Sequence, residues 1–527
     1  MMEENKETPG KSMNTVPEPV DNSWLPQDSH PIFHLVLLWS LTYVIMKVIQ
    51  VFWYRQNMVN ALQCFPLPPT HWLYGHVHKL TPEEEFLTTA AWTEKYPQCH
   101  QLRYGQFVVA LVINHPEYAK VVFTRSDPKS FLIYGFLIPW IGKGLLILDG
   151  PKWKQHRKLL TPGFHYDILK PYTTVMVESV KQMLVILEKL VSTDNTASVE
   201  IFEHVSLMSL DTIMKCAFSS KSNCQTERDN AYIKAVYELT CLFDKRVKSP
   251  WIHNDIMYWF SSQGRRFHNA CRLAHHHTDN VIRERKESLK NEQELEKISK
   301  KRRLDLLDIL ICAKDENGNS LSDEDLRAEV DTFMFEGHDT TASGISWLFY
   351  CMAQNPEHQQ RCREEIMELL GKEGHVQWDD LGKMTYTTMC IKESLRLYPP
   401  VPQVARDLNL PVTFPDGRTL PKGLLTLLSI YNLHRNPEVW DNPEVFDPLR
   451  FSFENSSRRH PFAFLPFAAG PRSCIGQQFA MNEMKVALAL TLLRFELLPD
   501  RSKPPIPIPQ IVTRSKNGIH LKLKPIY

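Results

Sequence analysis

Hydrophobic residues recur at helical spacing through most of the chain after residue 150, and they group as short strands in only two stretches. Residues 98–123 predict short strands followed by a helix, and strand signals return near 401–431. No internal repeat interrupts this pattern. It predicts a mainly α fold with small β-sheets, of the α+β class, in one large domain over residues 76–527.

A strongly apolar run covers residues 32–54 and is long enough to cross a bilayer as one helix. The polar tail 1–31 precedes it, and bulky aromatic residues close it at Phe52, Trp53 and Tyr54. A cleaved signal peptide begins with a basic segment and ends at small residues, so we expect a retained single membrane anchor. A helix lying flat in the membrane interface is the alternative.

The charges on the two sides of this run differ in sign. The tail 1–31 is acidic, whereas Lys47 and Arg55 lie at the other end, and basic residues tend to stay on the cytoplasmic side of a membrane. We therefore expect the rest of the chain to face the cytosol. Prolines between residues 55 and 75 predict a stiff, extended hinge ahead of the large domain.

Composition excludes several classes of protein. The net charge is +1, from 61 basic and 60 acidic residues, so nothing indicates nucleic-acid binding. The 11 cysteines form no CxxC pair, which argues against a disulfide scaffold and for a reducing compartment. The charged stretch 283–303 predicts a solvated helix or a connecting segment.

One cysteine lies in a loop suited to chemistry. Cys474 belongs to the segment FAAGPRSCIG, which runs from Phe467 to Gly476 and directly precedes a helical pattern. A helix N-terminus stabilises an anion, so we expect it to lower the pKa of this thiol. Gly470 and Gly476 let the backbone approach a flat ligand. A cysteine thiolate bound to haem iron favours cleavage of the O–O bond.

A second motif lies within a long predicted helix. Ser322, with Asp325 three residues later, predicts its start, and Asn355 before Pro356 predicts its end. Glycine and threonine cluster in its middle, which indicates a distortion where a ligand presses on the backbone. Thr340 can bond a carbonyl one turn back, and Glu336 lies one turn before it on the same face.

The segment around Cys474 matches the pattern F-x-x-G-x-R-x-C-x-G at every fixed position and resembles the haem-binding signature of the cytochrome P450 superfamily. The resemblance covers the chain from about residue 60 to the end. The runs EVDTFMFEGHDTT and PRSCIGQQFAMNEMK look most similar to B-type members of family 4, the fatty-acid omega-hydroxylases. It implies the cytochrome P450 fold, a haem-thiolate catalytic domain over 76–527, and haem b between the long central helix and the cysteine-bearing loop. Cys474 is then the axial ligand of the iron.

The resemblance also assigns roles to individual residues. It implies that Thr340 and Asp339 deliver protons to bound oxygen and that Glu336 forms an ester with a haem methyl group. A carboxylate that stays non-covalent beside the haem is the alternative for Glu336. A structural network is implied between Glu393 and Arg396, three residues apart in KESLRLYPPVP, and Arg450. The implied contacts of the cofactor, mainly with its propionates, are Arg472, Arg406, Arg157, Trp153 and Phe467, with His434 as a further candidate.

These features imply a monooxygenase that hydroxylates fatty acids at the terminal or near-terminal carbon, and also apolar xenobiotics, with O2 and electrons from NADPH-cytochrome P450 reductase. Cytochrome b5 and the lipid bilayer are further expected partners, and the expected location is the endoplasmic reticulum membrane. A haem-thiolate isomerase and a non-catalytic haem sensor or carrier are the rival functions. The pair of Asp339 and Thr340 argues against both, because neither rival needs proton delivery to oxygen.

Two further segments keep two interpretations each. Phe131–Leu137 is expected at the substrate entrance or in the core. A basic cluster is expected either on the face that docks the reductase or on an ordinary solvated helix face. It consists of Lys152, Lys154, Arg157 and Lys158.

Overall fold

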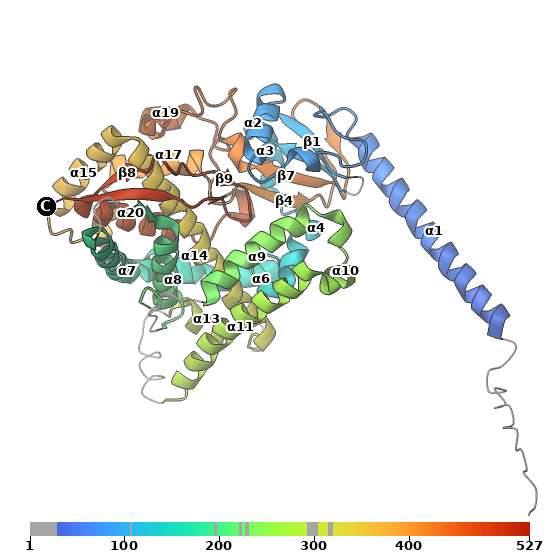
Figure 1. The fold of residues 1–527 in the computed structure, drawn as a ribbon, viewed down its shortest axis with the longest axis horizontal. Helices are drawn as coiled ribbons and strands as arrows, with labels where there is room; N and C mark the ends of the chain where they lie inside the picture. The colour runs from blue at the N-terminus through green and yellow to red at the C-terminus, as the bar shows by residue number, and fades with distance from the viewer. Residues whose placement is uncertain are drawn as a thin grey trace, which may run out of the picture. The chain divides into compact units, whose positions relative to one another are not determined.

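Long helices make up most of the structure, a computed structural model that describes residues 29–105, 108–193, 198–220, 224–226, 231–291, 304–314 and 320–526 (Figure 1). The predicted mainly α class with small sheets is confirmed. The acidic part of the tail, 1–28, lies outside the described residues, as does 292–303 of the charged stretch. The main helices after the first are α2 (Glu85–Lys95), α6 (Gly150–Leu160), α7 (Tyr166–Thr193), α8 (Ile201–Ala217), α9 (Ala231–Val247), α11 (Ser262–Ser288), α14 (Asp323–Gln354), α15 (Pro356–Leu370), α17 (Thr385–Leu397) and α20 (Gln477–Arg494). The shorter ones are α3 (Pro116–Phe123), α4 (Phe131–Tyr134), α5 (Ile138–Ile141), α10 (Asp255–Phe260), α13 (Leu306–Cys312), α16 (Trp378–Leu381), α18 (Ile430–Leu433) and α19 (Phe453–Arg458).

The first helix, α1 (Ser29–Ala61), contains the predicted apolar run and extends beyond it. The chain divides into two compact units, residues 1–57 and 58–527. Phe33–Ala61 is long and apolar enough to cross a membrane, and none of its most apolar window is buried. The helix continues past residue 54 because no proline or glycine interrupts it before Pro66.

The segment after α1 belongs to the second unit and is held against its first strand. Leu62 and Phe65 are buried. The Gln101 side chain donates to both of their carbonyls at 2.8 Å, and its backbone N–H donates to the carbonyl of Pro66 at 2.8 Å. These bonds fix the start of the proline-rich segment on the sheet, and its role as a hinge stays a prediction.

The larger sheet has the strand order β1-β2-β7-β4. Strands β1 (Cys99–Tyr104) and β2 (Val108–Ile113) form an antiparallel hairpin followed by α3, as predicted for residues 98–123. Strands β4 (Gln403–Asp407) and β7 (Leu425–Ser429) confirm the strands predicted near 401–431. Because β2 pairs with β7 in parallel, the sheet joins two distant parts of the chain.

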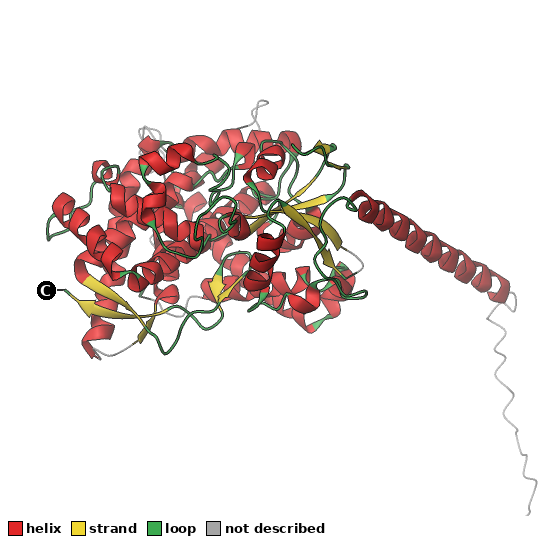
Figure 2. Cartoon of the chain, turned by 90° about the horizontal axis from the view of Figure 1, so that it is seen from above, coloured by secondary structure: helices red, strands yellow, loops and turns green. Residues whose placement is uncertain are grey.

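The second sheet brings the last residues of the chain into the fold. Strand β11 (His520–Pro525) lies between β3 (Ser198–Glu200) and β8 (Phe495–Pro499). The two larger sheets stand apart from each other among the helices, in yellow in Figure 2. Two small strand pairs complete the set: β5 (Val412–Thr413) with β6 (Thr419–Leu420), and β9 (Pro507–Ile508) with β10 (Arg514–Ser515).

Helix α14 is the central helix of the core and has the predicted bounds. The Ser322 hydroxyl accepts the N–H of Asp325 at 3.0 Å, and the helix ends at Gln354 before Asn355. It packs against α8, α17 and α20; most of its side chains are buried, and most of the apolar ones belong to one large hydrophobic cluster. A helix enclosed on so many sides gives rigid support to any group that it presents to a cavity.

Candidate active site

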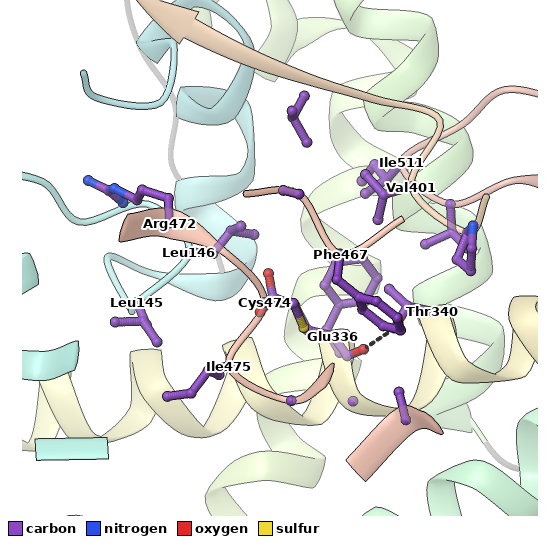
Figure 3. Close-up of a pocket in the computed structure, with 18 of the residues that line it drawn as sticks. Leu145, Leu146, Glu336, Thr340, Val401, Phe467, Arg472, Cys474, Ile475 and Ile511 are labelled. Atoms are coloured by element: carbon purple, nitrogen blue, oxygen red, sulfur yellow. Dashed lines mark hydrogen bonds between the residues drawn. The ribbon is translucent and has the colours of Figure 1, made fainter. Parts of the chain in front are cut away.

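An internal cavity of about 300 Å³ lies between the middle of α14 and the loop before α20. Both predicted motifs reach it: Glu336 and Thr340 line it from the helix and Cys474 from the loop (Figure 3). The other walls are largely apolar and include Leu145, Leu146, Phe333, Phe335, Val401 and Ile511. The enclosure favours a large apolar ligand with a few placed polar contacts.

Cys474 lies where the loop turns towards α20. Its backbone N–H donates to the Phe467 carbonyl at 2.9 Å, which closes the loop, and Gly476 is the N-cap of the helix. Burial and the nearby carboxyl of Glu336 together raise the pKa of the Cys474 thiol to about 11. The N–H of Gly476 at the helix terminus lowers this pKa, as expected, but burial outweighs that effect and the net shift is upward. A metal ion removes the proton of a coordinated thiol outright.

Gly470 is required by the path of the loop itself. Its φ is +71°, and a Cβ atom there would lie 2.0 Å from the carbonyl oxygen of Phe123 in α3. Gly476 is different, since its φ is −89° and a Cβ atom would make ordinary contacts of 3.8 Å with Phe164 and 4.0 Å with Cys474. Only glycine fits position 470, because φ is positive there and because a side chain would collide with the backbone of α3.

The middle of α14 presents a hydroxyl and a carboxyl to the cavity. Thr340 Oγ1 donates to the Glu336 carbonyl at 2.7 Å, as predicted, and Thr341 donates to the Gly337 carbonyl at 3.0 Å. The Thr340 oxygen keeps lone pairs that can accept a further hydrogen bond. Burial raises the pKa of Glu336, while the positive charge of Lys129 opposes the rise.

Asp339 lies behind this wall and not on it. Its side chain is 2% exposed, and Arg514 from β10 donates to its Oδ1 at 2.6 Å. The guanidinium of Arg514 is 3.8 Å from the ring centroid of Tyr237 and 4.9 Å from that of Phe202. Oδ2 of Asp339 has no hydrogen-bond partner among the described residues. Sequence reasoning missed Arg514, because no local motif marks a residue in a short strand near the chain end.

The predicted cationic residues meet at one side of the cavity. Arg472 lies over the Trp153 ring at 4.3 Å, and Arg157 donates to the Ser473 carbonyl at 3.0 Å. Arg406 also lines the cavity, and so does Lys129, which sequence reasoning missed. All of the predicted cofactor contacts except His434 line it: Glu336, Arg472, Arg406, Arg157, Trp153 and Phe467.

These cations fit a ligand with two negative charges. Burial lowers the pKa of Arg472 to about 10 and that of Lys129 to about 7, so an anion bound beside them would stabilise their charged forms. Nη1 of Arg472 is buried and has no hydrogen-bond partner among the described residues. The two propionates of haem b would supply both the charge and the acceptor oxygens, and the Cys474 sulfur would supply the axial ligand.

The predicted structural network forms outside the cavity. Arg396 donates to both carboxylate oxygens of Glu393 at 2.8 Å, with both side chains fully buried, and Nε of Arg450 lies 3.4 Å from Oε1 of Glu393. Arg396 also donates to the carbonyls of His434, Pro443 and Val445. Three of the five bonds from this guanidinium tie α17 to the chain that leads to the cysteine loop.

His434 is part of this network and does not line the cavity. Its Nδ1 contacts the Arg396 carbonyl at 3.2 Å, and its Nε2 accepts the N–H of Leu465 at 2.8 Å. Burial lowers the pKa of His434 well below its usual range. With both ring nitrogens engaged, His434 supports the loop and is not placed to bind a propionate.

The segment Phe131–Leu137 and the basic cluster of α6 each have some residues that face inward and others that are exposed. Within Phe131–Leu137, Tyr134 and Leu137 line the cavity, whereas the Phe131 side chain is exposed. On α6, Lys152, Lys154 and Lys158 are exposed and Arg157 turns inward to the cysteine loop. The structure therefore leaves three lysines on the outer face of this helix, where docking of a partner stays a prediction.

The Cys474 sulfur faces a cavity with largely apolar walls, which also carry several cations and a threonine bonded to the carbonyl one turn before it. This combination is typical of haem-thiolate proteins of the oxygen-activating class. The family model described as Cytochrome P450 matches residues 65–523. The chain belongs to the cytochrome P450 family and is a cytochrome P450 monooxygenase.

Individual relatives confirm family 4. The chain is 57% identical to cytochrome P450 4B1 of Rattus norvegicus over 493 residues, which cover 93% of this chain and 96% of the relative. It is 56% identical to cytochrome P450 4A11 of Homo sapiens over 498 residues, which cover 94% of this chain and 95% of the relative. Cytochrome P450 4A24 of Sus scrofa is 57% identical over 495 residues, covering 94% of this chain and 97% of the relative. B-type relatives thus stand among the matches, beside A-type relatives at similar identity.

Proposed function

We propose that this monooxygenase hydroxylates fatty acids at the terminal or near-terminal carbon and also accepts apolar xenobiotics. Electrons would come from NADPH-cytochrome P450 reductase, with cytochrome b5 as a further donor. The observation that carries the proposal is the apolar cavity beside Cys474, which Glu336 and Thr340 close on the opposite side. A terminal C–H bond is not the most reactive one in a chain, so the selectivity must come from how the walls position the substrate.

Residues of this chain would hold the cofactor and supply protons. Haem b, when bound, supplies oxygen activation and electron transfer. Cys474 would ligate the iron, and Arg472, Arg406, Arg157 and Trp153 would contact the propionates, with Lys129 as an added cation. The Thr340 hydroxyl would hold a proton donor in the cavity, and Asp339, restrained by Arg514, would be the acid behind it.

Glu336 is proposed to form an ester with a haem methyl group during turnover: one methyl C–H bond and the carboxyl O–H bond are broken as the C–O bond forms, and O2 with NADPH is the oxidant, reduced to water. Its position on the cavity wall and its burial support this role, because a buried carboxyl has few competing partners. The measurement is acid extraction of haem from the purified protein. Haem that resists extraction from the wild type but leaves Glu336→Ala freely is the expected result, and haem freely extracted from both would favour the non-covalent carboxylate.

The proposed location is the endoplasmic reticulum membrane, with α1 as the single anchor and the unit 58–527 in the cytosol. The apolar exposed surface of α1 supports an anchor. Lys47 and Arg55, both in the C-terminal half of α1, support the orientation. Protease added to sealed microsomes is expected to digest the catalytic unit, and full protection would reverse the proposed orientation.

The central experiment is the carbon-monoxide difference spectrum of the reduced protein, recorded for wild type and Cys474→Ser. A strongly red-shifted Soret band is expected in the wild type and lost in the variant, because only a thiolate ligand produces the shift. Turnover of dodecanoate with reductase, NADPH and O2 then tests the substrate. A haem-loaded wild type without the red shift would exclude thiolate ligation, and normal spectra with no chain hydroxylation would exclude the substrate class alone.

A further inference from the structure

A second polar group lines the same cavity away from the cysteine loop. It comprises Asp244 and Lys248 at the end of α9, with Tyr104 from β1 beside them. The charged neighbours of Lys248 are Glu85 and Asp244, whereas Lys129 and Arg157 both interact with Cys474. Arg472 interacts with Arg406 and Arg157. The cations of the cavity therefore fall into two groups. Lys129, Arg157, Arg406 and Arg472 belong to the group around the cysteine loop, and Lys248 stands apart from that group with Glu85 and Asp244.

Lys248 is held between two carboxyl groups from different helices. Its Nζ lies 2.6 Å from Oε2 of Glu85 in α2 and 3.0 Å from Oδ1 of Asp244. The side chains of Lys248 and Asp244 keep 14% and 17% of their surface exposed, and both face the cavity. Glu85 is more deeply buried, at 8%. An ammonium group has three N–H donors, and these two carboxyls occupy two of them.

The cluster is unbalanced in charge, with one ammonium and two carboxyls. Burial raises the pKa of Glu85 to about 6, against the lowering effect of Lys248, and Asp244 adds to the rise. Burial also raises the pKa of Asp244. Tyr104 faces Glu85 from β1, while Lys245 acts on Asp244 and the ion pair of Glu83 with Lys516 lies nearby. The pKa of Glu85, the more deeply buried of the two carboxyls, therefore lies close enough to neutral pH for it to take up a proton there.

We propose that Glu85, Asp244 and Lys248 form the head-group site of the cavity, where Lys248 binds the carboxylate of a chain substrate while Glu85 takes up one proton from solvent. The inference rests on the proposed function, since the other end of the chain is presumed to reach Cys474. The substrate carboxylate takes the place of Glu85 as partner of Lys248. The filled site then carries the same net charge as the empty one, so the exchange avoids adding a charge to a buried cluster.

The exchange makes binding depend on pH for one class of substrate. A carboxylate head group binds with uptake of a proton, so its affinity rises as pH falls towards the pKa of Glu85, by at most tenfold per pH unit. An alcohol head group accepts from the third N–H of Lys248 without any proton uptake. Its affinity is then independent of pH over the same range.

The test uses the haem-loaded holoenzyme and the shift of its absorption spectrum on substrate binding. Dodecanoate, 1-dodecanol and dodecane are titrated between pH 6.5 and 8, a range in which dodecanoate stays ionised. In the wild type, the dissociation constant of dodecanoate is expected to fall several-fold towards pH 6.5, while those of the other two stay constant. Glu85→Gln keeps the ion pair of Lys248 with Asp244 and is expected to bind dodecanoate about tenfold more tightly at pH 8, without pH dependence.

Two further variants separate head-group binding from structural damage. Lys248→Met in the Glu85→Gln background is expected to weaken dodecanoate binding about tenfold and leave dodecane unchanged. Lys170→Met removes an exposed lysine of α7, outside the cluster, and is expected to change neither. The carbon-monoxide difference spectrum checks that each variant is folded.

The outcomes are distinguishable from those of the proposed function. Equal pH dependence for dodecanoate and dodecanol, or unchanged dodecanoate affinity in Glu85→Gln, overturns the head-group site even if all chains are hydroxylated. If none of the three chains shifts the spectrum of a folded wild type, the fatty-acid substrate class fails as well.

Discussion

Glu483 shows how a single buried carboxyl ties the stability of the protein to pH. It lies on α20, fully buried, and burial raises its pKa from 4.5 to about 8. The folded state therefore keeps a proton that the unfolded state releases in this interval. Stability is fullest below pH 4.5 and declines as pH rises to about 8.

Replacing Glu483 with glutamine removes this dependence. The wild type is expected to lose up to about 1.4 kcal/mol per pH unit between pH 5 and 8 through this group, and Glu483→Gln is expected to lose less. Thermal melting of both proteins across that range measures the difference, with Glu368→Gln on the exposed side of α15 as a control. Parallel pH profiles for wild type and Glu483→Gln would contradict the raised pKa.

Thr340 and Thr341 offer a matched test of proton delivery. Both line the cavity, and both donate to a carbonyl one turn back. Thr340→Ala is expected to reduce hydroxylated product per NADPH consumed about tenfold, because general acid catalysis is worth at least that much. Thr341→Ala is expected to change this ratio far less. Product and peroxide are measured against NADPH consumption, and equal loss in both variants would exclude a specific role for Thr340.

At the scale of elements, the cysteine loop depends on its contact with α3. Gly470 has positive φ, and any side chain there would collide with the carbonyl of Phe123. Gly470→Ala is expected to displace the loop and remove most of the thiolate-ligated haem, whereas Gly476→Ala meets only ordinary contacts. The carbon-monoxide difference spectrum per protein is the measurement. A full red-shifted band in Gly470→Ala would mean that the loop accommodates a side chain at this position without losing the haem ligand.

The elements also show what local signals can and cannot predict. The bounds of α14 follow from Ser322 and Pro356, and the loop of Cys474 from its glycines, because each signal lies within a few residues of the feature. The partners of these groups cannot be found that way. Arg514 reaches Asp339 from a strand 175 residues later, and its own neighbours carry no pattern.

Local signals also fall short for the net pKa of Cys474. A helix terminus was expected to lower the pKa of Cys474, and that effect is local and readable from sequence. Burial raises this pKa instead, and the extent of burial depends on walls contributed by α6, α14 and the sheet. Lys129 was missed for the same reason, since its place in the cavity is set by tertiary packing.

At the scale of the whole molecule, the catalytic unit should fold without the part of α1 that precedes Met58. Among the described residues, the hydrophobic clusters of the second unit include none before Met58. Deletion of residues 1–57 is expected to leave the red-shifted spectrum intact and to move most of the protein from the membrane pellet to the soluble fraction. Ultracentrifugation with spectral assay tests both. Loss of the spectrum in soluble protein would show that α1 contributes to folding.

The second sheet has a consequence for how the protein is made. Strand β11 is formed by the last residues of the chain, and Arg514 just before it holds Asp339 in the middle of α14. While the ribosomal exit tunnel still covers these residues, α14 can form but one of its central carboxylates lacks its counter-charge. Emergence of Arg514, and not completion of the long helix, is then the event after which this buried carboxylate has its counter-charge.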